Sequence, residues 1–213
     1  MRPLPRRRPS AEHGGVLAAR QSRHAPRRHR PGPADLPVNI KALIRTIPDW
    51  PLPPVRFRDV STLLRDPQGF RAAMDMFVSF YREKKFDVIA GLDARGFIPA
   101  GVLAYVLEKP LVMVRKKGKL PGETIHAAYQ LEYGQSILEI QTDAAPRGAN
   151  VLILDDLIAT GGTLCAAVQL FANIGCTVTD VGAIVNLSEL SGSRRLERIG
   201  VRVYSLCEFN ETE

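Results

Sequence analysis

The amino-acid sequence predicts an open α/β fold, with a mainly parallel five-stranded sheet flanked by helices. The first observation is that short aliphatic runs alternate with segments of helical periodicity, as in proteins built from β–α units. The second is that two of these runs lead into small glycine-containing loops, each followed by a helix. Ligands of open α/β sheets bind at loops of this kind, where the parallel strands end.

Two helices are predicted before the first strand of the sheet. Residues 39–47 carry a helical stripe of aliphatic side chains, which predicts a short helix that ends at Pro48. Asp66 and Pro67 suit the N-cap and the first turn of a longer helix. Aromatic and aliphatic residues then recur at helical spacing, so this second helix is expected to pack on the core.

A hairpin and the strands of the sheet make up the rest of the predicted fold. The segments 124–131 and 136–141 alternate loosely around Gly134, which predicts a β-hairpin. The remaining aliphatic runs are bounded by turn residues and predict parallel strands joined by helices. The five expected strands are 86–91, 111–114, 151–154, 178–187 and 201–206, and the later helices are 97–107, 164–175 and 193–199.

The composition is that of an ordinary globular protein. Of the 213 residues, 45% are hydrophobic and 24% are charged, which is enough for one domain with a substantial core. No apolar run approaches the ~20 residues of a membrane helix, so no membrane partner is expected. Three cysteines without a C-x-x-C spacing indicate reduced thiols and a cytoplasmic protein.

Residues 1–37 differ from the rest of the chain. They hold nine Arg against Glu12 and Asp35, whereas the other 20 basic side chains are balanced by 20 acidic ones. Many Arg and Pro residues with little aliphatic clustering predict a disordered extension, followed by a domain over 38–213. Three interpretations stay open: a transit peptide, an arm that binds nucleic acid, or a dispensable extension from a start codon placed too early. We favour the last interpretation. If the protein binds nucleic acid at all, we expect residues 1–37 to do so, and not the domain.

The segment 150–163 predicts a phosphate-binding loop. Residues 151–154 are aliphatic and form a buried strand, and small residues follow before the next helix begins. Glycines let backbone N–H groups approach an anion, and the helix N-terminus adds about half a positive charge. The sequence contains neither G-x-x-x-x-G-K-[ST] nor G-x-G-x-x-G, which argues against a P-loop enzyme and a dinucleotide-binding fold.

An acidic pair, Asp155 and Asp156, stands between this strand and its loop. Two carboxylates would repel a phosphate, so we expect them to face another part of the same ligand, such as ribose hydroxyls or a bound cation. A sugar that carries a 5′-phosphate and free hydroxyls satisfies both requirements. The alternative is a plain strand–turn–helix corner with an acidic N-cap.

A second strand–loop–helix corner has the sequence Asp93-Ala94-Arg95-Gly96. Arg95 beside a helix N-terminus suits a diphosphate, because a guanidinium binds phosphate oxygens in a bidentate way. The alternative is a surface ion pair between Arg95 and Asp93. This corner has the same strand–loop–helix layout as the first.

A basic loop follows the strand 111–114. Residues 115–119 contain four cations in five positions, among them Arg115 and Lys119. A charge run is most often a solvated surface, but this one follows the carboxyl end of a strand in a chain that already has a predicted phosphate site. We therefore predict a mobile hairpin lid, residues 115–141, that carries charge to the ligand.

Four segments together resemble one known family. The segment 151–163 resembles the loop of type I phosphoribosyltransferases that binds 5-phosphoribosyl 1-diphosphate (PRPP). The segments 57–61, 91–97 and 115–134 resemble the adenine phosphoribosyltransferases within that family. The likeness extends over about residues 38–208 in the same order, so it is more specific than a match to one motif.

The resemblance implies a purine-salvage transferase that converts adenine and PRPP into AMP and diphosphate. It implies Mg²⁺ as cofactor, with diphosphate, hydroxyl and water ligands and none directly from the protein. It also implies a homodimer, in which Arg115 can act in the neighbouring subunit. The expected residues are Glu132 for handling the purine proton; Asp155, Asp156, Ala159, Thr160, Gly161, Gly162, Thr163, Arg95, Arg115 and Lys119 for PRPP; and Phe57, Arg58 and Leu157 for adenine.

Residues 38–62 are expected to form a small hood over the purine, with Phe57 stacked on the base. Trp50, which lies among prolines, is expected to pack rather than to stack on a base. Pro54 and Arg56 depart from the family pattern, which has glycine and a small apolar residue there. Two rival hypotheses stay open: a transferase for another base, and a regulatory protein that senses PRPP and binds nucleic acid through residues 1–37.

Overall fold

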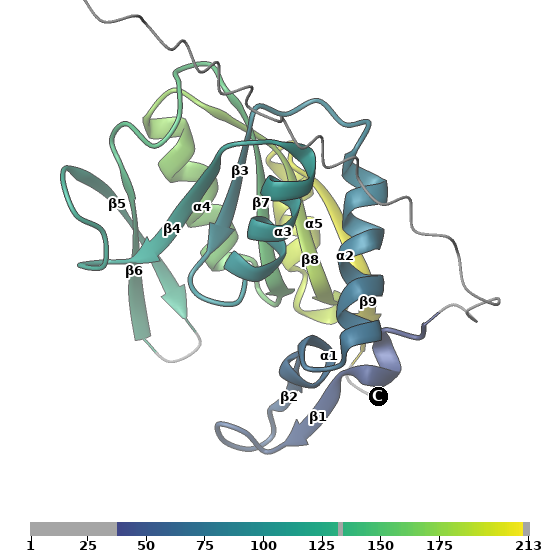
Figure 1. Ribbon diagram of the computed structural model, residues 1–213. Helices are drawn as coiled ribbons and strands as arrows, with labels where there is room; N and C mark the ends of the chain where they lie inside the picture. The colour runs from purple at the N-terminus through teal and green to yellow at the C-terminus, as the bar shows by residue number, and fades with distance from the viewer. Residues whose placement is uncertain (1–37, 132–133, 211–213) are drawn as a thin grey trace, which may run out of the picture. The chain divides into compact units, whose positions relative to one another are not determined.

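The computed structural model of the protein describes residues 38–131 and 134–210. The predicted extension, residues 1–37, lies outside them. The strands of the main sheet are β3 (Val88–Leu92), β4 (Leu111–Lys116), β5 (Thr124–Leu131), β6 (Gly134–Gln141), β7 (Asn150–Ile158), β8 (Thr177–Leu187) and β9 (Arg202–Phe209). Within the described residues they lie in the order β5-β6-β4-β3-β7-β8-β9 (Figure 1).

The five predicted strands are confirmed as one parallel set. The strands β4, β3, β7, β8 and β9 are neighbours in that order, and each pairs with the next in parallel. The sheet has seven strands rather than five because the predicted hairpin joins it. Strand β5 pairs antiparallel with β6, and β6 pairs antiparallel with β4. The hairpin therefore extends the sheet at one edge.

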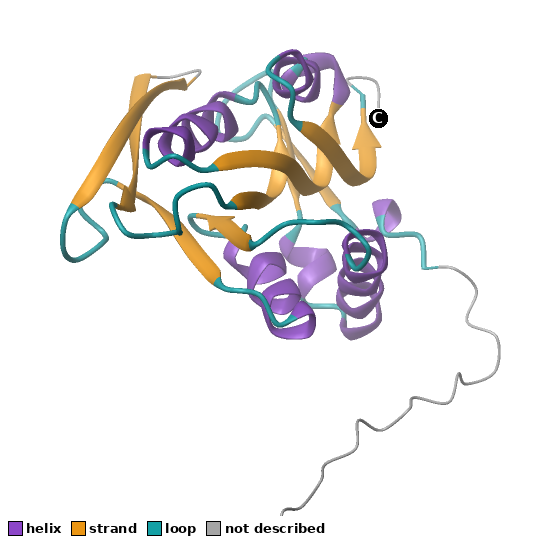
Figure 2. Cartoon of the chain, turned by 90° about the horizontal axis from the view of Figure 1, so that it is seen from above, coloured by secondary structure: helices purple, strands orange, loops and turns teal. Residues whose placement is uncertain are grey.

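Helices cover both faces of the parallel strands (Figure 2). They are α1 (Ser61–Leu64), α2 (Pro67–Tyr81), α3 (Phe97–Leu107), α4 (Gly162–Asn173) and α5 (Gly192–Arg198), with short 3-10 helices η1 (Lys41–Leu43) and η2 (Ser188–Leu190). None of these helices, among the described residues, is long and apolar enough to cross a membrane.

The aliphatic run of β7 is explained by burial on two faces. Val151 and Ile153 pack with the buried side chains of α4, whereas Leu152 and Leu154 pack with those of α2 and α3. Successive side chains of a strand point to opposite faces, so a strand between two helical layers has no polar face. The run 151–154 is thus the central wall between two cores.

The hood begins differently from the prediction. The expected helix over 39–47 is wrong: after η1 the chain forms strand β1 (Arg45–Pro48), which pairs antiparallel with β2 (Arg56–Asp59). The aliphatic stripe reflects burial instead, since Ile40 and Ile44 lie in the core shared with α2 and α3. Pairing with β2 outweighs the weak helical preference of so short a segment. Helix α2, by contrast, begins as predicted, with the Asp66 side chain accepting the Gly69 N–H at 2.7 Å.

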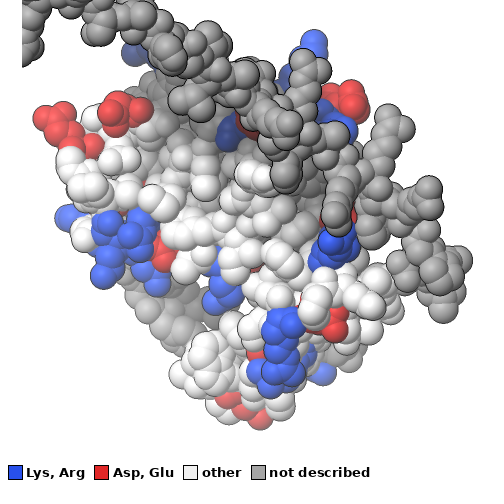
Figure 3. All heavy atoms as spheres, in the orientation of Figure 1, with Lys and Arg blue, Asp and Glu red and all other residues white. Residues whose placement is uncertain are grey.

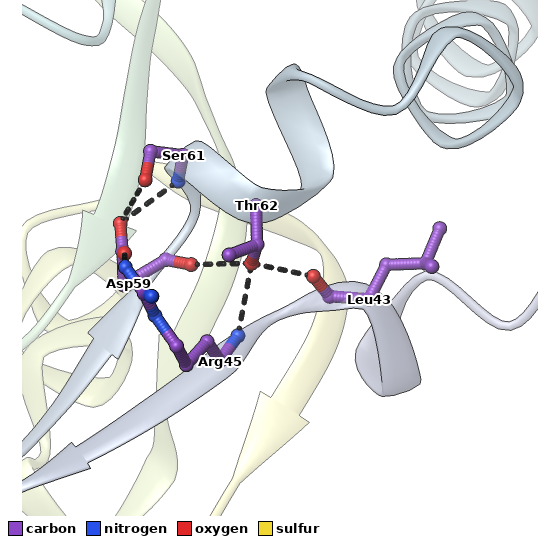
Figure 4. Close-up of polar contacts among 5 residues, drawn as sticks. All are labelled: Leu43, Arg45, Asp59, Ser61 and Thr62. Atoms are coloured by element: carbon purple, nitrogen blue, oxygen red, sulfur yellow. Dashed lines mark hydrogen bonds and ion pairs between the residues drawn. The ribbon is translucent and has the colours of Figure 1, made fainter.

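A polar network centred on Asp59 holds the hood together (Figure 4). Asp59 Oδ2 accepts from Arg45 Nη2 at 2.5 Å, and Oδ1 accepts from the Ser61 N–H and hydroxyl at 3.0 and 2.6 Å. The Thr62 hydroxyl donates to Leu43 O at 2.6 Å and accepts the Arg45 N–H at 3.1 Å. The hydrogen bonds from Ser61, and next those from Arg45, lower the pKa of Asp59 to about 2. Strands β1 and β2 and helix α1 therefore form one unit.

The predicted lid has a packed part and an exposed part. Tyr129, Leu138 and Ile140 of the hairpin are buried in the core that contains α4. The residues that follow β4, from Lys117 to Lys119, are exposed. We call residues 117–123 the lid loop. The hairpin itself is confirmed, whereas its mobility stays a prediction.

Candidate active site

The candidate site lies where β3, β4 and β7 end. Strand β3 pairs in parallel with β4 on one side and with β7 on the other, so the loops that follow these strands emerge at one edge. From β3 the chain proceeds to β4, and from β7 it proceeds in the opposite direction to β8. The point between the ends of β3 and β7 is therefore a topological switch point, where ligands of open α/β sheets bind.

The loop between β7 and α4 has the geometry of an anion-binding loop. Gly161 has φ +76°, which glycine adopts without strain, and α4 begins at the next residue, Gly162. The first N–H groups of a helix have no partner within it and are free to bind an anion. Ala159, Thr160 and Thr163 are all at least partly exposed, so the predicted loop residues lie together with accessible hydroxyls.

The Arg95 guanidinium pairs with Asp156. Its Nε donates to Asp156 Oδ2, and the Asp156 side chain is 9% exposed against 51% for Arg95. Partial burial alone would lower the pKa of Arg95, but the charges of Asp156, Asp155 and the hood residue Asp59 outweigh it and raise that pKa. The alternative of a surface ion pair between Arg95 and Asp93 is wrong. The second corner therefore faces the acidic pair, as a shared ligand requires.

The carboxyl group of Asp155 lies in surroundings that disfavour its negative charge. Burial, and next the neighbouring charge of Asp156, raise the pKa of Asp155 well above its ordinary value. Its Oδ1 accepts the Asp156 N–H at 2.9 Å, which offsets only part of this cost. Two adjacent acids at a switch point, one with a strongly raised pKa, are typical of functional sites.

Strand β4 brings Arg115 to the same edge. Arg115 Nε donates to Asp93 Oδ2 at 3.1 Å, and Nη1 donates to Lys119 O at 3.1 Å. Lys119 is exposed on the lid loop. Figure 3 shows basic side chains gathered on the left of the molecule, near the end of β4. The three cations predicted for a diphosphate thus come from the loop after β3, the end of β4 and the lid loop, and each arginine is held by a carboxylate.

The predicted adenine residues of the hood differ in their surroundings. Phe57 is partly buried and contacts Trp50 edge to face, with ring centroids 4.4 Å apart, so Trp50 packs on Phe57 as expected. Arg58 is buried, and its guanidinium donates to Thr46 Oγ1 at 2.5 Å and to Asn210 O at 3.2 Å. The Arg58 side chain is therefore engaged within the protein, which agrees with a role for its backbone.

The remaining predicted residues are Leu157 and Glu132. Leu157 follows Asp156 on β7 and packs against the core that contains the hood residues Ile44 and Val60. Glu132 lies outside the described residues. Its place at the tip of the hairpin therefore stays a prediction.

Two supporting residues, Glu139 and Gly192, were not predicted from the sequence. Glu139 of β6 accepts the N–H groups of Lys119 and Leu120 at 2.7 and 2.8 Å, although an acid in an alternating strand looks like a solvent-facing residue. Gly192, the first residue of α5, packs directly beneath the phosphate loop. A Cβ at Gly192 would lie 2.2 Å from Ala159 O, a contact between distant segments that no local pattern signals.

Comparisons with known proteins agree with this geometry. The family model described as phosphoribosyl transferase domain matches residues 59–210. The chain is 47% identical over 174 residues to the adenine phosphoribosyltransferase of Bordetella avium, covering 82% of this chain and 96% of that protein.

Solved structures give the same result. The adenine phosphoribosyltransferase of Thermoanaerobacter pseudethanolicus matches with a TM-score of 0.76 and 41% identity, covering 80% of this chain and 98% of that one. The Saccharomyces cerevisiae protein, crystallised with an imino-altritol bisphosphate and adenine, matches with a TM-score of 0.72 and 35% identity over 79% and 96% of the two chains. With this identity over nearly the full length of its relatives, the chain belongs to the adenine phosphoribosyltransferase family.

Proposed function

We propose that the protein transfers the phosphoribosyl group of PRPP to adenine, giving AMP and diphosphate in purine salvage. The observation that carries this proposal is the meeting of the phosphate loop, the acidic pair and Arg95 at the switch point between β3 and β7. Family membership supports the reaction. The yeast relative, crystallised with adenine and an imino-altritol bisphosphate, supports the choice of ligands.

PRPP would lie at the switch point with its 5′-phosphate in the loop between β7 and α4. The N–H groups of residues 159–163 and the hydroxyls of Thr160 and Thr163 would bind that phosphate. Asp155 and Asp156 would accept hydrogen bonds from the ribose hydroxyls. Their negative charge favours the positive charge that develops on the ribose as its bond to diphosphate breaks.

The leaving diphosphate would be neutralised by Arg95, Arg115 and Lys119. Both arginines already lie at this edge of the sheet, where Asp156 and Asp93 hold them. A diphosphate with several charged oxygens offers each guanidinium a stronger partner than one carboxylate. Binding of PRPP would therefore release Asp156 from Arg95 and leave it free for the ribose.

Mg²⁺ would enter the site with PRPP. Among the described residues, no three His, Cys, Asp or Glu side chains cluster to hold a metal ion. The acidic pair offers two carboxylates, and Asp156 is shared with Arg95. Because the ribose hydroxyls would occupy these carboxylates, the site fits a cation held by diphosphate, hydroxyl and water oxygens, with no ligand directly from the protein. When bound, Mg²⁺ would supply positive charge to the diphosphate, while the protein orients the ribose.

Adenine would lie between the hood and the end of β7. Phe57 would stack on the base, the Arg58 backbone would read its edge, and Leu157 would contact it from the sheet. Glu132 of the hairpin turn would handle the purine proton.

A homodimer is the proposed assembly. Helix α3 and strand β4 expose apolar side chains that a second copy would cover, and Tyr105 is 87% exposed. Alternation along β4 puts Leu111, Met113 and Arg115 on one face, which supports a place for Arg115 beside this subunit contact. The exposed residues of the surface are Ile98, Tyr105, Val106, Leu111 and Met113.

The proposed location is the cytoplasm. Cys165, Cys176 and Cys207 are all free, and burial raises the pKa of each thiol. Free thiols are kept in a reducing compartment, and none of the three is placed as a reactive residue.

A panel of purine bases tests the proposal. The full chain is incubated with PRPP, Mg²⁺ and adenine, hypoxanthine, guanine or xanthine, and the nucleotide products are separated and measured. We expect AMP from adenine and at least about 10⁴-fold lower turnover of the oxo purines, because an acceptor would face an acceptor at the 6-position. Faster turnover of hypoxanthine than of adenine would show a transferase for another base.

A further inference from the structure

Glu139 is a buried acid whose partners are mainly backbone groups of the lid loop. It lies on β6 directly opposite Arg115 of β4, and its side chain is 2% exposed. Its Oε1 accepts the N–H groups of Lys119 at 2.7 Å and Leu120 at 2.8 Å. Its Oε2 lies 3.4 Å from Thr124 Oγ1. The lid loop is thus folded around a single carboxylate.

The same loop is held at a second point by Arg115. Arg115 Nη1 donates to Lys119 O at 3.1 Å, so both the N–H and the carbonyl group of Lys119 are fixed. Gly118 has φ +82°, which lets the chain reverse just before Lys119. The Lys119 side chain is left exposed, with its backbone secured on both sides.

The charge of Glu139 suits this task. Burial alone would raise its pKa, but the N–H groups of Leu120, Gly118 and Lys119 outweigh burial and lower it, so Glu139 stays ionised. Hydrogen bonds to an ionised acceptor are about twice as strong as neutral ones. A buried negative charge also offsets the mutual repulsion of the four cations in residues 115–119.

We propose that Glu139 is a positioning residue, which holds the lid loop so that the Lys119 side chain faces the diphosphate of PRPP. This inference rests on the proposed function. Glu139 does not touch the substrate; it acts through the backbone of Lys119. Loss of the hydrogen bonds between Glu139 and the lid loop would therefore weaken PRPP binding and leave adenine binding unchanged.

The test is a double-mutant cycle on PRPP kinetics with Glu139→Gln and Lys119→Ala. Glutamine keeps the shape of the side chain but removes its charge. We expect Glu139→Gln to raise the KM for PRPP about tenfold, the loss of a charged hydrogen bond, and to change the KM for adenine less than about twofold. In the Lys119→Ala background the same substitution should change the KM for PRPP less than about threefold, because the side chain it positions is gone.

The matched control is Asp180→Asn. Asp180 is also a buried acid on the sheet, but it pairs with Arg202 at 2.7 Å, where β9 begins, away from the lid loop. This variant is expected to keep both KM values of the wild type. Hydrogen exchange on the wild-type protein gives a second measurement that needs no variant: the amides of Lys119 and Leu120 should be protected, although both lie in an exposed loop.

Three results would overturn the role of Glu139. They are a wild-type KM for PRPP in Glu139→Gln, an equal rise in the KM for adenine, or an undiminished effect in the Lys119→Ala background. Unprotected amides at Lys119 and Leu120 would also contradict it, even if the variant failed to fold. A wild-type chain that makes no AMP would instead refute the proposed function, so the two failures are distinct.

Discussion

Arg95 and Asp156 join the two phosphate-facing corners of the sheet through one ion pair. Arg95 belongs to the loop after β3, Asp156 lies near the end of β7, and the Arg95 Nε donates to the Asp156 carboxylate. Asp156, which is proposed to bind the ribose, is thus paired with Arg95, which is proposed to bind the diphosphate. Binding of PRPP would break this ion pair. Arg95 would then contact the diphosphate, and Asp156 would contact the ribose hydroxyls.

Replacing Arg95 should weaken PRPP binding selectively. A charged hydrogen bond contributes about 1.5–3 kcal/mol, so Arg95→Ala should raise the KM for PRPP roughly 10–100-fold and leave the KM for adenine nearly unchanged. Steady-state kinetics with each substrate varied in turn measures both values. Arg202→Ala is the control, because Arg202 pairs with Asp180 at the start of β9. Equal effects of the two substitutions would argue against a site at Arg95.

Removing the charge of Asp155 should stabilise the fold and damage the function. Its pKa is raised by burial and by Asp156, so the stability that this group contributes is fully present below its unfolded pKa of about 3.9 and is lost as pH rises through the folded pKa. At pH 7 the variant Asp155→Asn should therefore melt higher, by about 2–4 °C for each 1 kcal/mol gained.

Calorimetry at pH 7 and at pH 4 tests this sign, since the advantage of Asp155→Asn should shrink at the lower pH. The variant should also bind PRPP more weakly, because asparagine lacks the charge that favours the positive ribose. A lower melting temperature at pH 7 would contradict the raised pKa of Asp155.

The contact of Gly192 with the phosphate loop gives a steric prediction. A Cβ at Gly192 would lie 2.2 Å from Ala159 O and 2.7 Å from Gly161 N, so the loop must move in Gly192→Ala. We expect the KM for PRPP to rise about tenfold and the fold to lose about 1–3 kcal/mol.

The lowered pKa of Asp59 predicts how the stability of the hood changes with pH. Its pKa is lowered to about 2, so its contribution to stability is present above the unfolded pKa of about 3.9 and is lost as pH falls through about 2. Asp59→Asn should therefore unfold more easily than the wild type at pH 7, and the difference should narrow between pH 4 and pH 2. Urea unfolding followed by Trp50 fluorescence reports on the hood, since Trp50 is the single tryptophan and contacts Phe57.

The control for the hood is Asp75→Asn, on the exposed side of α2. It should match the wild type at every pH. If the effect of Asp59→Asn were the same at pH 7 and at pH 2, the network around Asp59 would not be the cause.

Glu132 is tested by its proposed chemistry. Glu132→Ala should lower kcat by about 10²-fold or more, within the usual range for a group that transfers a proton. Glu123→Ala is the matched control, because Glu123 is an exposed acid of the lid loop. Rapid-quench measurement of AMP formation separates the chemical step from product release. Turnover near the wild-type rate in Glu132→Ala would remove Glu132 from this role.

Much of the fold could be predicted because strong local patterns control it. The run 151–154 is aliphatic at every position because β7 is buried on both faces. The loop 159–163 could be predicted because its small residues and glycines are typical of a tight turn before a helix. The helix predicted over 39–47 is wrong because, over a single turn, the spacing of buried side chains cannot be told from helical spacing. There the pairing of β1 with β2 decided the structure.

The site could be predicted only as far as its residues lie in recognisable loops. Whether Arg95 pairs with Asp93 or with Asp156 depends on the register of β3 and β7, which the sequence does not encode locally. The roles of Glu139 and Gly192 depend on contacts across the sheet edge and between two helix starts. Such contacts become visible only when the whole chain is folded.

The most direct test of the central claim is diffraction from crystals grown with PRPP and Mg²⁺. We expect the 5′-phosphate to contact the N–H groups of residues 159–163, and the ribose hydroxyls to lie within hydrogen-bond distance of Asp155 and Asp156. We also expect Arg95 to have left Asp156 for the diphosphate. PRPP bound elsewhere, or an Arg95–Asp156 pair that persists beside a bound diphosphate, would contradict the central claim.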